Sequence, residues 1–326
     1  MRLSAPARTL TAASVGIGAI LSTGGAAAQN SGPEPVQPLL WLPILGIALL
    51  LPAYIMLLRW LRRRAAARID TGQQEQPVFS PVELERYSRH ILLREIGGEG
   101  QRQFRNARVA VIGAGGLGSP ALLYLAAAGV GRITVIDDDR VELSNLQRQI
   151  IHADEGVGRL KVESAADAMR ALNPHIEINP VSERLQRDSQ ELLAGHDLVL
   201  DGSDSFDTRF LVNEICVEQG IRLVSGAIGQ WEGQVTVLDA AEGPCLACLF
   251  PEKPSPELAP SCAEAGVLAP LPGIIGAIMA AEALKVISDT GAALRGKLLI
   301  YDALWGQIRT VSFSGRPDCR ICGKPD

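Results

Sequence analysis

The chain has few histidines, few aromatic residues and no excess of basic charge. Four of its 326 residues are histidine, 4% are aromatic, and the formal net charge is −5. An acidic chain with so few aromatic side chains offers neither the charge nor the stacking surfaces that nucleic acid needs, so no nucleic-acid partner is expected. The histidines show no ligand-like spacing, which disfavours a histidine-centred metal site or catalytic centre.

The first 30 residues (1–30) combine the parts of a secretory signal peptide. Arg2 and Arg8 precede a short apolar stretch rich in alanine and glycine, and Ala26, Ala27 and Ala28 supply a small-residue end. A basic start, an apolar region and a small-residue end are typical of such signals. A disordered extension is the alternative.

A transmembrane helix is predicted at residues 39–58. This stretch of about 20 residues carries no charge, which matches the thickness of the hydrocarbon layer. Residues 59–79 begin with a cluster of arginines, which favours the cytoplasmic side, and continue as a polar linker. We therefore expect a single-pass, membrane-anchored protein of a bacterial inner membrane, with residues 80–326 as one cytoplasmic domain. A buried core helix is the alternative for residues 39–58.

A glycine-rich loop follows the first apolar run of this domain. Residues 108–112 indicate a short strand, the sequence GAGGLG occupies 113–118, and residues 119–128 indicate a helix. Such glycines permit a tight turn and let the backbone approach a phosphate at the helix N-terminus. They are Gly113, Gly115, Gly116 and Gly118.

A second apolar run, residues 132–136, ends at Asp137. An acid about 20 residues beyond such a loop is where a dinucleotide-binding fold holds a ribose hydroxyl. On these features alone, an NAD-dependent oxidoreductase of Rossmann type is the default interpretation.

Polar and charged residues further along change this interpretation. Asn145 and Arg148 lie in a polar stretch close to the expected strand ends, and Lys161 opens another helix. Asp201 and Asp204 follow a further short strand, where a carboxylate can hold Mg²⁺ against phosphates. Several cations near a phosphate loop suit a site that expels pyrophosphate, whereas an NAD enzyme needs little such charge. We therefore favour ATP as the ligand and keep the oxidoreductase as an alternative.

Five stretches follow one another between about Ser80 and Gly323. They are RYSRHILL (86–93), GAGGLG (113–118), SNLQRQ (144–149), GRLKVESA (158–165) and DGSD (201–204). Together, and in this order, they resemble the MoeB/ThiF/HesA family of adenylyltransferases, bacterial relatives of ubiquitin-activating enzymes. The resemblance covers essentially the whole domain after the linker.

The resemblance implies a role for each matched residue. Asp137 would hold the ATP ribose, and the glycine loop would bind the phosphates. Asn145, Arg148 and Lys161 would contact the triphosphate and stabilise the departing pyrophosphate. Asp204 would coordinate Mg²⁺.

Two further positions follow from the resemblance. Arg89 would reach the phosphates of the neighbouring subunit's ATP, because members of the family are homodimers with composite sites. Ser205 is a departure, since the family often has asparagine there. Serine can still form a hydrogen bond, so we expect tuning of the site and no loss of activity.

The activity that the resemblance implies is ATP-dependent adenylation of a small ubiquitin-like sulfur-carrier protein ending in Gly-Gly. The carrier's C-terminal glycine carboxylate would attack ATP and release pyrophosphate, in molybdopterin or thiamine (thiazole) biosynthesis. A carboxylate is already deprotonated near neutral pH, so positioning and charge stabilisation would suffice without a general base. A non-catalytic membrane-anchored scaffold is a third hypothesis.

Two Cys-x-x-Cys pairs predict a zinc site. Cys245 with Cys248 and Cys319 with Cys322 lie about 70 residues apart and can supply four thiolates to a tetrahedral Zn²⁺. A closed site leaves no position for water, so we expect structural Zn²⁺ that is coupled to folding. A redox pair is the alternative.

Two cysteines remain outside these pairs. Cys262 follows a proline-rich loop and would be a nucleophile if its thiolate were favoured. In relatives that go beyond adenylation, a cysteine here receives the activated acyl group, and in others it is dispensable. Cys216 lies in a helical pattern and is expected in the core.

The order of apolar runs predicts an α/β fold. We expect a Rossmann-like, mostly parallel sheet with helices on both faces and additional antiparallel strands. A capped helix from Ser80 is expected to bury Leu84, Tyr87, Ile91 and Leu92, and residues 272–287 to form an apolar helix in the core or at a dimer interface. The expected strands are residues 108–112, 132–136, 176–179, 198–200 and 222–224, followed by 233–238, 297–301 and 307–313.

Overall fold

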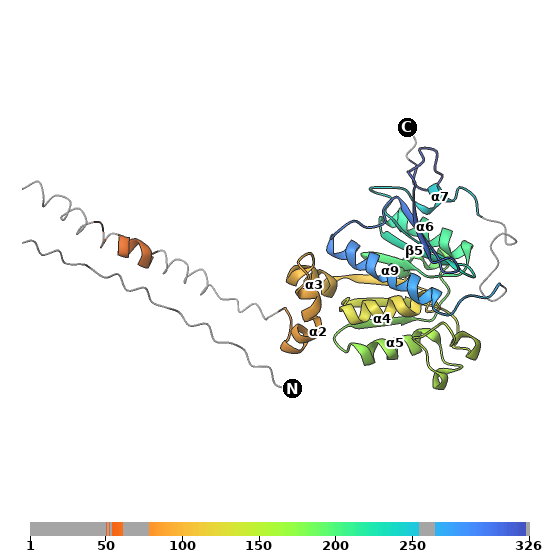
Figure 1. Cartoon of the computed structure of the whole chain (residues 1–326), viewed down its shortest axis with the longest axis horizontal. Helices are drawn as coiled ribbons and strands as arrows, with labels where there is room; N and C mark the ends of the chain where they lie inside the picture. Colours follow the sequence, from red (N-terminus) through yellow and green to blue (C-terminus); the bar gives the residue numbers. More distant parts are fainter. Residues whose placement is uncertain (1–49, 51, 53, 61–77, 254–264, 324–326) are drawn as a thin grey trace, which may run out of the picture. The chain divides into compact units, whose positions relative to one another are not determined.

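The computed structural model describes residues 50, 52, 54–60, 78–253 and 265–323 (Figure 1). The chain divides into two units, Met1–Glu75 and Gln76–Asp326. In the first unit the described residues are helical. The predicted signal peptide, most of the predicted transmembrane helix and most of the predicted linker lie outside the described residues.

Eight strands form one mixed sheet in the described part of the second unit. Their order is β3-β2-β1-β4-β5-β6-β7-β8. The first five are parallel, and β6, β7 and β8 continue the sheet in antiparallel pairs. This confirms the predicted fold class. The strands are β1 (Arg108–Ile112), β2 (Arg132–Ile136), β3 (Glu177–Val181), β4 (Leu198–Asp201), β5 (Arg222–Ile228), β6 (Glu232–Leu238), β7 (Lys297–Asp302) and β8 (Gln307–Ser312).

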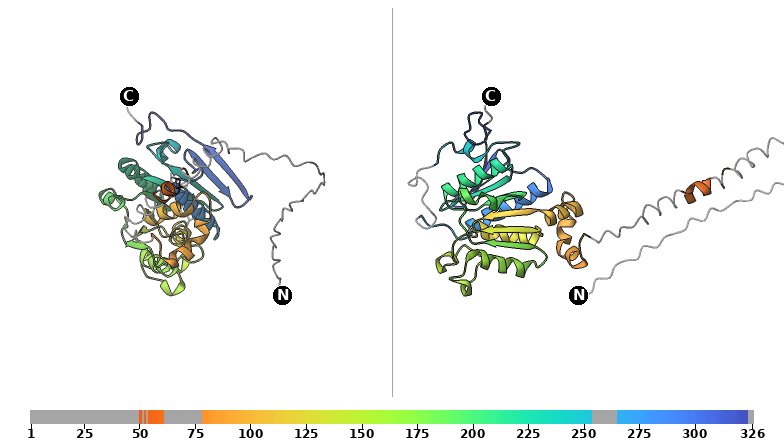
Figure 2. Two further views of the ribbon diagram at one scale, coloured as in Figure 1. Left: turned by 90° about the vertical axis from the view of Figure 1, so that its left-hand side faces the viewer. Right: turned by 180° about the vertical axis from the view of Figure 1, so that it is seen from behind.

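Helices cover both faces of the sheet (Figures 1 and 2). The α-helices are α2 (Pro81–Ile91), α3 (Gly97–Asn106), α4 (Gly118–Ala128), α5 (Lys161–Leu172), α6 (Phe206–Gln219), α7 (Leu246–Leu249) and α9 (Leu271–Ser288). Short 3₁₀ helices are η2 (Leu143–Asn145), η3 (Asp154–Gly156) and η4 (Arg187–Leu193). Helices α4, α5 and α9 line one core cluster, and α6, α7 and η4 line the other.

The strands alternate between these two clusters. Val109 and Val111 of β1 face the first cluster, and Ala110 and Ile112 face the second. Successive side chains of a strand point to opposite faces. A strand that is buried on both faces therefore needs a continuous apolar run, which is why β1 and β2 are easy to recognise in the sequence.

Helix α9 belongs to the core. Within the described residues it is the one helix long and apolar enough to cross a membrane, and most of it is buried. It packs against α4, β5 and β6, with Ile275, Met279 and Ala283 fully buried. Of the two locations expected from the sequence, the core and a dimer interface, the structure shows the core.

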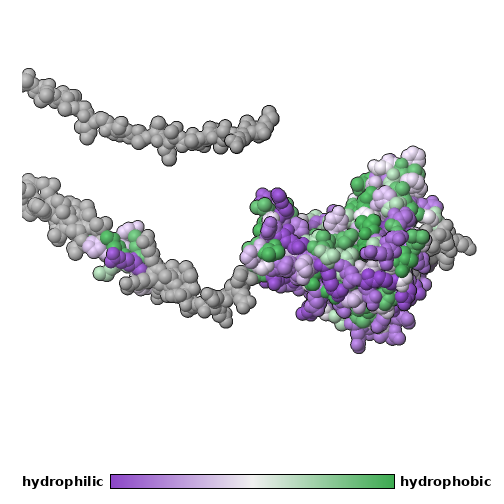
Figure 3. All heavy atoms as spheres, turned by 90° about the horizontal axis from the view of Figure 1, so that it is seen from below, coloured by the Kyte–Doolittle hydropathy of each residue, from purple (hydrophilic) through white to green (hydrophobic). Residues whose placement is uncertain are grey.

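Helix α2 begins as predicted but buries fewer side chains than expected. Ser80 and Glu83 form a reciprocal capping box at its start. Tyr87 is buried, whereas Leu84 and Leu92 are exposed, which corrects the prediction. Helix α2 packs on α3. Figure 3 shows one face of this unit, on which hydrophobic areas interrupt a largely hydrophilic surface.

Candidate functional site

A pocket opens at the carboxyl ends of the parallel strands. It encloses about 880 Å³ and is lined by residues that directly follow three strands: Gly113 after β1, Asp137 after β2 and Gly202 after β4. Strand β1 lies between β2 and β4, so these three strand ends meet at one edge. Open α/β sheets bind their ligands at this edge.

The glycine-rich loop turns the chain from β1 into α4 beside the pocket. Gly113 has a φ of +92°, in the left-handed region that favours glycine. A Cβ at Gly118 would lie 1.9 Å from the carbonyl oxygen of Gly113, so no side chain fits there. Gly115 and Gly116 line the pocket. Gly113 and Gly118 are therefore required by the turn, and Gly113, Gly115 and Gly116 form part of the surface that a ligand meets.

Asp137 holds this loop against the end of β2. Its Oδ2 accepts a hydrogen bond from the Ala114 amide at 2.7 Å, and its Oδ1 accepts one from the Asp139 amide at 2.8 Å. Burial raises the pKa of Asp137, and Lys161 together with these two amides opposes that rise. Each carboxylate oxygen has a second lone pair with which to accept a ligand hydroxyl.

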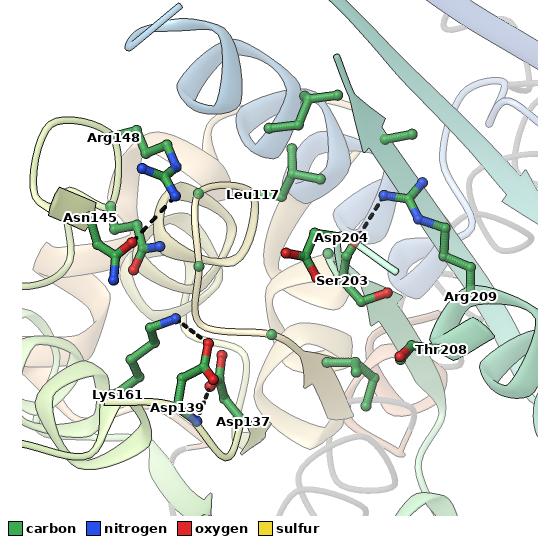
Figure 4. Close-up of a pocket in the computed structure, with 18 of the residues that line it drawn as sticks. Leu117, Asp137, Asp139, Asn145, Arg148, Lys161, Ser203, Asp204, Thr208 and Arg209 are labelled. Carbon is green, nitrogen blue, oxygen red and sulfur yellow. Dashed lines mark hydrogen bonds and ion pairs between the residues drawn. The ribbon is translucent and has the colours of Figure 1, made fainter. Parts of the chain in front are cut away.

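Lys161 is the first residue of α5 and points into the pocket. Its Nζ donates to Oδ2 of Asp139 at 2.6 Å (Figure 4). The side chain of Lys161 is 6% exposed and that of Asp139 is 65% exposed. Sequence reasoning missed Asp139 as a pocket residue. Its position two residues beyond Asp137, which in extended backbone faces the same side, was the available signal.

Asn145 and Arg148 line the same pocket (Figure 4). Arg148 donates through Nη2 to Oδ1 of Asn145 and through Nη1 to the carbonyl of Ser144, both at 3.3 Å. A guanidinium carries five N–H donors, and no described residue forms an ion pair with Arg148. Arg148 can therefore bind an anion in the pocket.

A tight turn after β4 presents Asp204 to the pocket. Asp201, fully buried, accepts hydrogen bonds from the amide and hydroxyl of Ser203 at 3.0 and 2.6 Å. Arg209 of α6 donates to the Ser203 carbonyl at 2.5 Å. Burial raises the pKa of Asp201. Asp204 forms no ion pair with any described residue, so its carboxylate is available to a ligand or a metal ion.

Ser205 caps α6 directly after this turn. Its hydroxyl accepts a hydrogen bond from the Thr208 amide at 3.4 Å. Serine and asparagine are both strong N-cap residues. Serine in place of the family's asparagine therefore still caps the N-terminus of α6.

Arg89 and Cys262 do not lie among the residues of this pocket. Arg89 is exposed on α2 and makes no ion pair or side-chain hydrogen bond with any described residue. A single subunit therefore does not bring Arg89 to its own pocket. Cys262 lies outside the described residues.

The four paired cysteines meet at a separate place. Their Sγ atoms all lie within 4.8 Å of one another, with 3.7 Å between Cys245 and Cys319 and 3.4 Å between Cys248 and Cys322. Zn–S bonds of about 2.3 Å in a tetrahedron require S–S edges of about 3.8 Å, so the set fits Zn²⁺. Cys216 is buried in α6, as predicted.

Comparison with family models adds to this geometry. Residues 87–321 match the model of the ThiF family. The chain belongs to the ThiF family. This confirms the predicted relationship and decides against the oxidoreductase alternative.

Relatives of this ThiF-family chain are similar over most of their length. A SAMP-activating enzyme E1 of Haloferax volcanii is 52% identical, with 74% of this chain and 90% of that protein covered. A sulfur carrier protein adenylyltransferase of Thermus thermophilus is 48% identical, with 75% and 93% covered. A molybdopterin-synthase adenylyltransferase of Salmonella typhimurium is 47% identical, with 76% and 99% covered.

Solved structures share the fold of this ThiF-family chain. A crystal structure of E. coli MccB with ATP has a TM-score of 0.65 at 23% identity, with 76% of each chain covered. A crystal structure of PaaA has a TM-score of 0.63 at 25% identity, with 79% of this chain and 83% of that chain covered. At 23% identity, the likeness to MccB extends to the fold and no further.

Proposed function

We propose that this ThiF-family chain adenylates the C-terminal glycine carboxylate of a small ubiquitin-like sulfur-carrier protein, in molybdopterin or thiamine (thiazole) biosynthesis. The observation that carries the proposal is the pocket, which joins a glycine loop, the cations Arg148 and Lys161 and the unpaired carboxylate of Asp204 at one sheet edge. Two similar proteins are named adenylyltransferases, one of a sulfur carrier protein and one of molybdopterin synthase.

The pocket residues would act on ATP in distinct ways. The amides of the glycine loop would bind the phosphates, and Asp137 would hold the ribose at the end of β2. Asn145, Arg148 and Lys161 would contact the triphosphate. This assignment is supported by their common place around the pocket.

The reaction is a displacement at phosphorus. A carboxylate oxygen of the carrier bonds to the α-phosphorus of ATP, and the bond from that phosphorus to its bridging oxygen breaks. Pyrophosphate leaves with the electron pair, and the acyl-adenylate remains. A terminal carboxyl group, with a pKa of about 3.5, is already ionised, so no general base is needed. The pocket lining includes no histidine. Arg148 and Lys161 would stabilise the charge on the leaving pyrophosphate.

Two metal ions fit the residues present. Mg²⁺ prefers oxygen ligands and accompanies phosphates, and Asp204 offers an unpaired carboxylate for it. Mg²⁺ would neutralise part of the phosphate charge. Zn²⁺ would be held by Cys245, Cys248, Cys319 and Cys322 in a closed, structural site.

A second copy of the chain would complete the site. Arg89 lies on α2 outside its own pocket, and apolar surface is exposed by Leu84 of the same helix and by Leu92 at its C-cap. We therefore propose a homodimer in which Arg89 reaches the partner's ATP.

Residues 39–58 would anchor the protein in the membrane, with the active domain in the cytoplasm. Cell fractionation of a chain lacking residues 1–75 tests the anchor, since that chain should then appear in the soluble fraction.

ATP–pyrophosphate exchange tests the activity. Exchange should require a candidate carrier that ends in Gly-Gly and should disappear with the same carrier lacking its final glycine. An absence of exchange with every such carrier would contradict the proposal. Attack of the Cys262 thiol on the acyl-adenylate would be a separate step, which would form a thioester and release AMP. Mass spectrometry would detect it as a thiol-sensitive conjugate absent from Cys262→Ser.

A further inference from the structure

His152 lies behind the glycine loop. It is 8% exposed, and its ring connects the loop to α5. Its Nε2 lies 3.0 Å from the carbonyl oxygen of Ala114, and its Nδ1 lies 2.9 Å from Oγ of Ser164. His152 does not line the pocket, and no step of the proposed reaction uses it.

The partners of His152 fix its tautomer. A carbonyl oxygen only accepts hydrogen bonds, so Nε2 must carry the hydrogen, and Nδ1 of the neutral ring accepts from the Ser164 hydroxyl. Burial lowers the pKa of His152, the bond to Ala114 opposes this shift, and the charge of Lys161 adds to it. The neutral ring with hydrogen on Nε2 is therefore the form present near neutral pH.

The peptide unit of Ala114 is held from two sides. Its amide donates to Oδ2 of Asp137 at 2.7 Å, and its carbonyl accepts from His152. Ala114 is fully buried and is absent from the pocket lining, although Gly113 and Gly115 on either side line it. The Ala114 carbonyl therefore points away from the pocket.

This orientation also sets the direction of the next amide. The described residues contain no cis peptide, and in a trans peptide the C=O of one residue and the N–H of the next point in opposite directions. The Gly115 amide has no acceptor among the described residues. We propose that His152 is a positioning residue, whose bond to the Ala114 carbonyl turns the Gly115 amide toward the phosphates of ATP. The inference rests on the proposed use of ATP.

Two substitutions separate the hydrogen bond from the packing. In His152→Gln the side-chain amide nitrogen can reach the place of the histidine Nε2, whereas in His152→Asn it reaches only the place of Nδ1. His152→Asn should weaken ATP binding about tenfold, or 1.4 kcal/mol, the size expected for one hydrogen bond to a charged group. His152→Gln should bind ATP within about twofold of wild type. Adenosine, which has no phosphate, should bind equally to all three proteins.

His196 provides a matched control. It is partly buried, with Nε2 at 2.9 Å from Oγ1 of Thr134 and Nδ1 at 3.1 Å from the Leu193 carbonyl, and, like His152, it lies outside the pocket. His196→Asn should keep the ATP affinity of the wild type. Thermal unfolding of each variant would show whether it is folded.

Titration calorimetry of the full chain with ATP and Mg²⁺, and with adenosine, measures these affinities. Equal ATP affinity in His152→Asn and wild type would overturn the inference about His152 but not the proposed function. Equal losses of ATP affinity in His152→Asn and His152→Gln would do the same. A wild-type chain that binds no ATP would overturn the proposed function as well.

A second measurement needs no variant. The chain has four histidines, so ¹⁵N-histidine NMR can resolve each ring. We expect the neutral tautomer with hydrogen on Nε2 at His152. The other tautomer would leave Ala114 without its donor and would overturn the inference.

Discussion

Replacing Lys161 with methionine would separate the role of this buried cation in the reaction from its role in the fold. Its ammonium lies 2.6 Å from Asp139, whose side chain is 65% exposed. Because water hydrates Asp139, losing the pair should resemble the loss of a surface ion pair, about 0–1 kcal/mol. Methionine keeps most of the aliphatic stem. We therefore expect a fall in melting temperature of no more than about 4 °C.

The effect on the reaction should be much larger. Removing one donor that stabilises charge in a transition state reduces the rate about 10²–10³-fold, or about 2.7–4 kcal/mol. Lys161→Met should lower carrier-dependent ATP–pyrophosphate exchange by this factor. Lys161→Arg keeps the charge but places a planar, larger group in a buried space, so its rate should be intermediate.

Lys253→Met is the matched control. Lys253 also pairs with an aspartate, Asp207, at 2.5 Å, but it does not line the pocket. The Lys253→Met variant should therefore retain wild-type ATP–pyrophosphate exchange. A folded Lys161→Met chain with more than about a third of wild-type exchange would refute the assignment of Lys161 to the leaving pyrophosphate, since the expected loss is about 10²-fold or more.

Four further changes have defined outcomes. Gly118→Ala should abolish ATP binding in calorimetry, because its Cβ would lie 1.9 Å from a carbonyl oxygen of the loop; retained affinity would mean that the loop can relax. Elemental analysis should find about one zinc ion per chain, and chelation should lower the melting temperature, because metal binding is coupled to folding. Mixed Arg89→Ala and Asp204→Ala chains, each inactive alone, should recover activity at about a quarter of sites if Arg89 acts across a twofold dimer, whereas no recovery would place it elsewhere. Burial lowers the pKa of both His152 and His196, so the unfolded chain binds more protons below about pH 6.5. Denaturant titrations should therefore show the free energy of unfolding falling as pH drops from about 6.5 through those lowered values, with a smaller slope in a double glutamine variant.

The parallel half of the sheet was predictable because both of its faces are buried. Strands β1 and β2 begin and end at the predicted residues. Strand β5 instead continues to Ile228, four residues beyond its predicted end at Val224. The extension contains Gly226, where a Cβ would lie 2.2 Å from Sδ of Met279. A glycine required by packing against a distant helix cannot be recognised from local periodicity.

The pocket residues that could be predicted lie in the matched stretches or, like Asp137, directly after an expected strand. Asp139 contacts Lys161 across 22 positions of sequence, and His152 contacts Ala114 across 38. Pairs so far apart become visible once the sheet brings their strands and helices together. The burial of Leu84 and Leu92 was predicted wrongly for a related reason. The periodicity of the sequence places these apolar residues on one face, but it does not show whether another element covers them.

The two cysteine pairs lie on either side of a long stretch that contains α9, β7 and β8. A zinc ion bound by both pairs would tie this stretch, about 70 residues, into a closed ring. Closing a ring removes conformations from the unfolded chain, so the unfolding of each element inside the ring depends on whether the ring is closed. Loss of the metal would open the ring and make unfolding of β7 and β8 more favourable. Hydrogen exchange in the β7–β8 hairpin should therefore report on metal occupancy at a site outside the sheet.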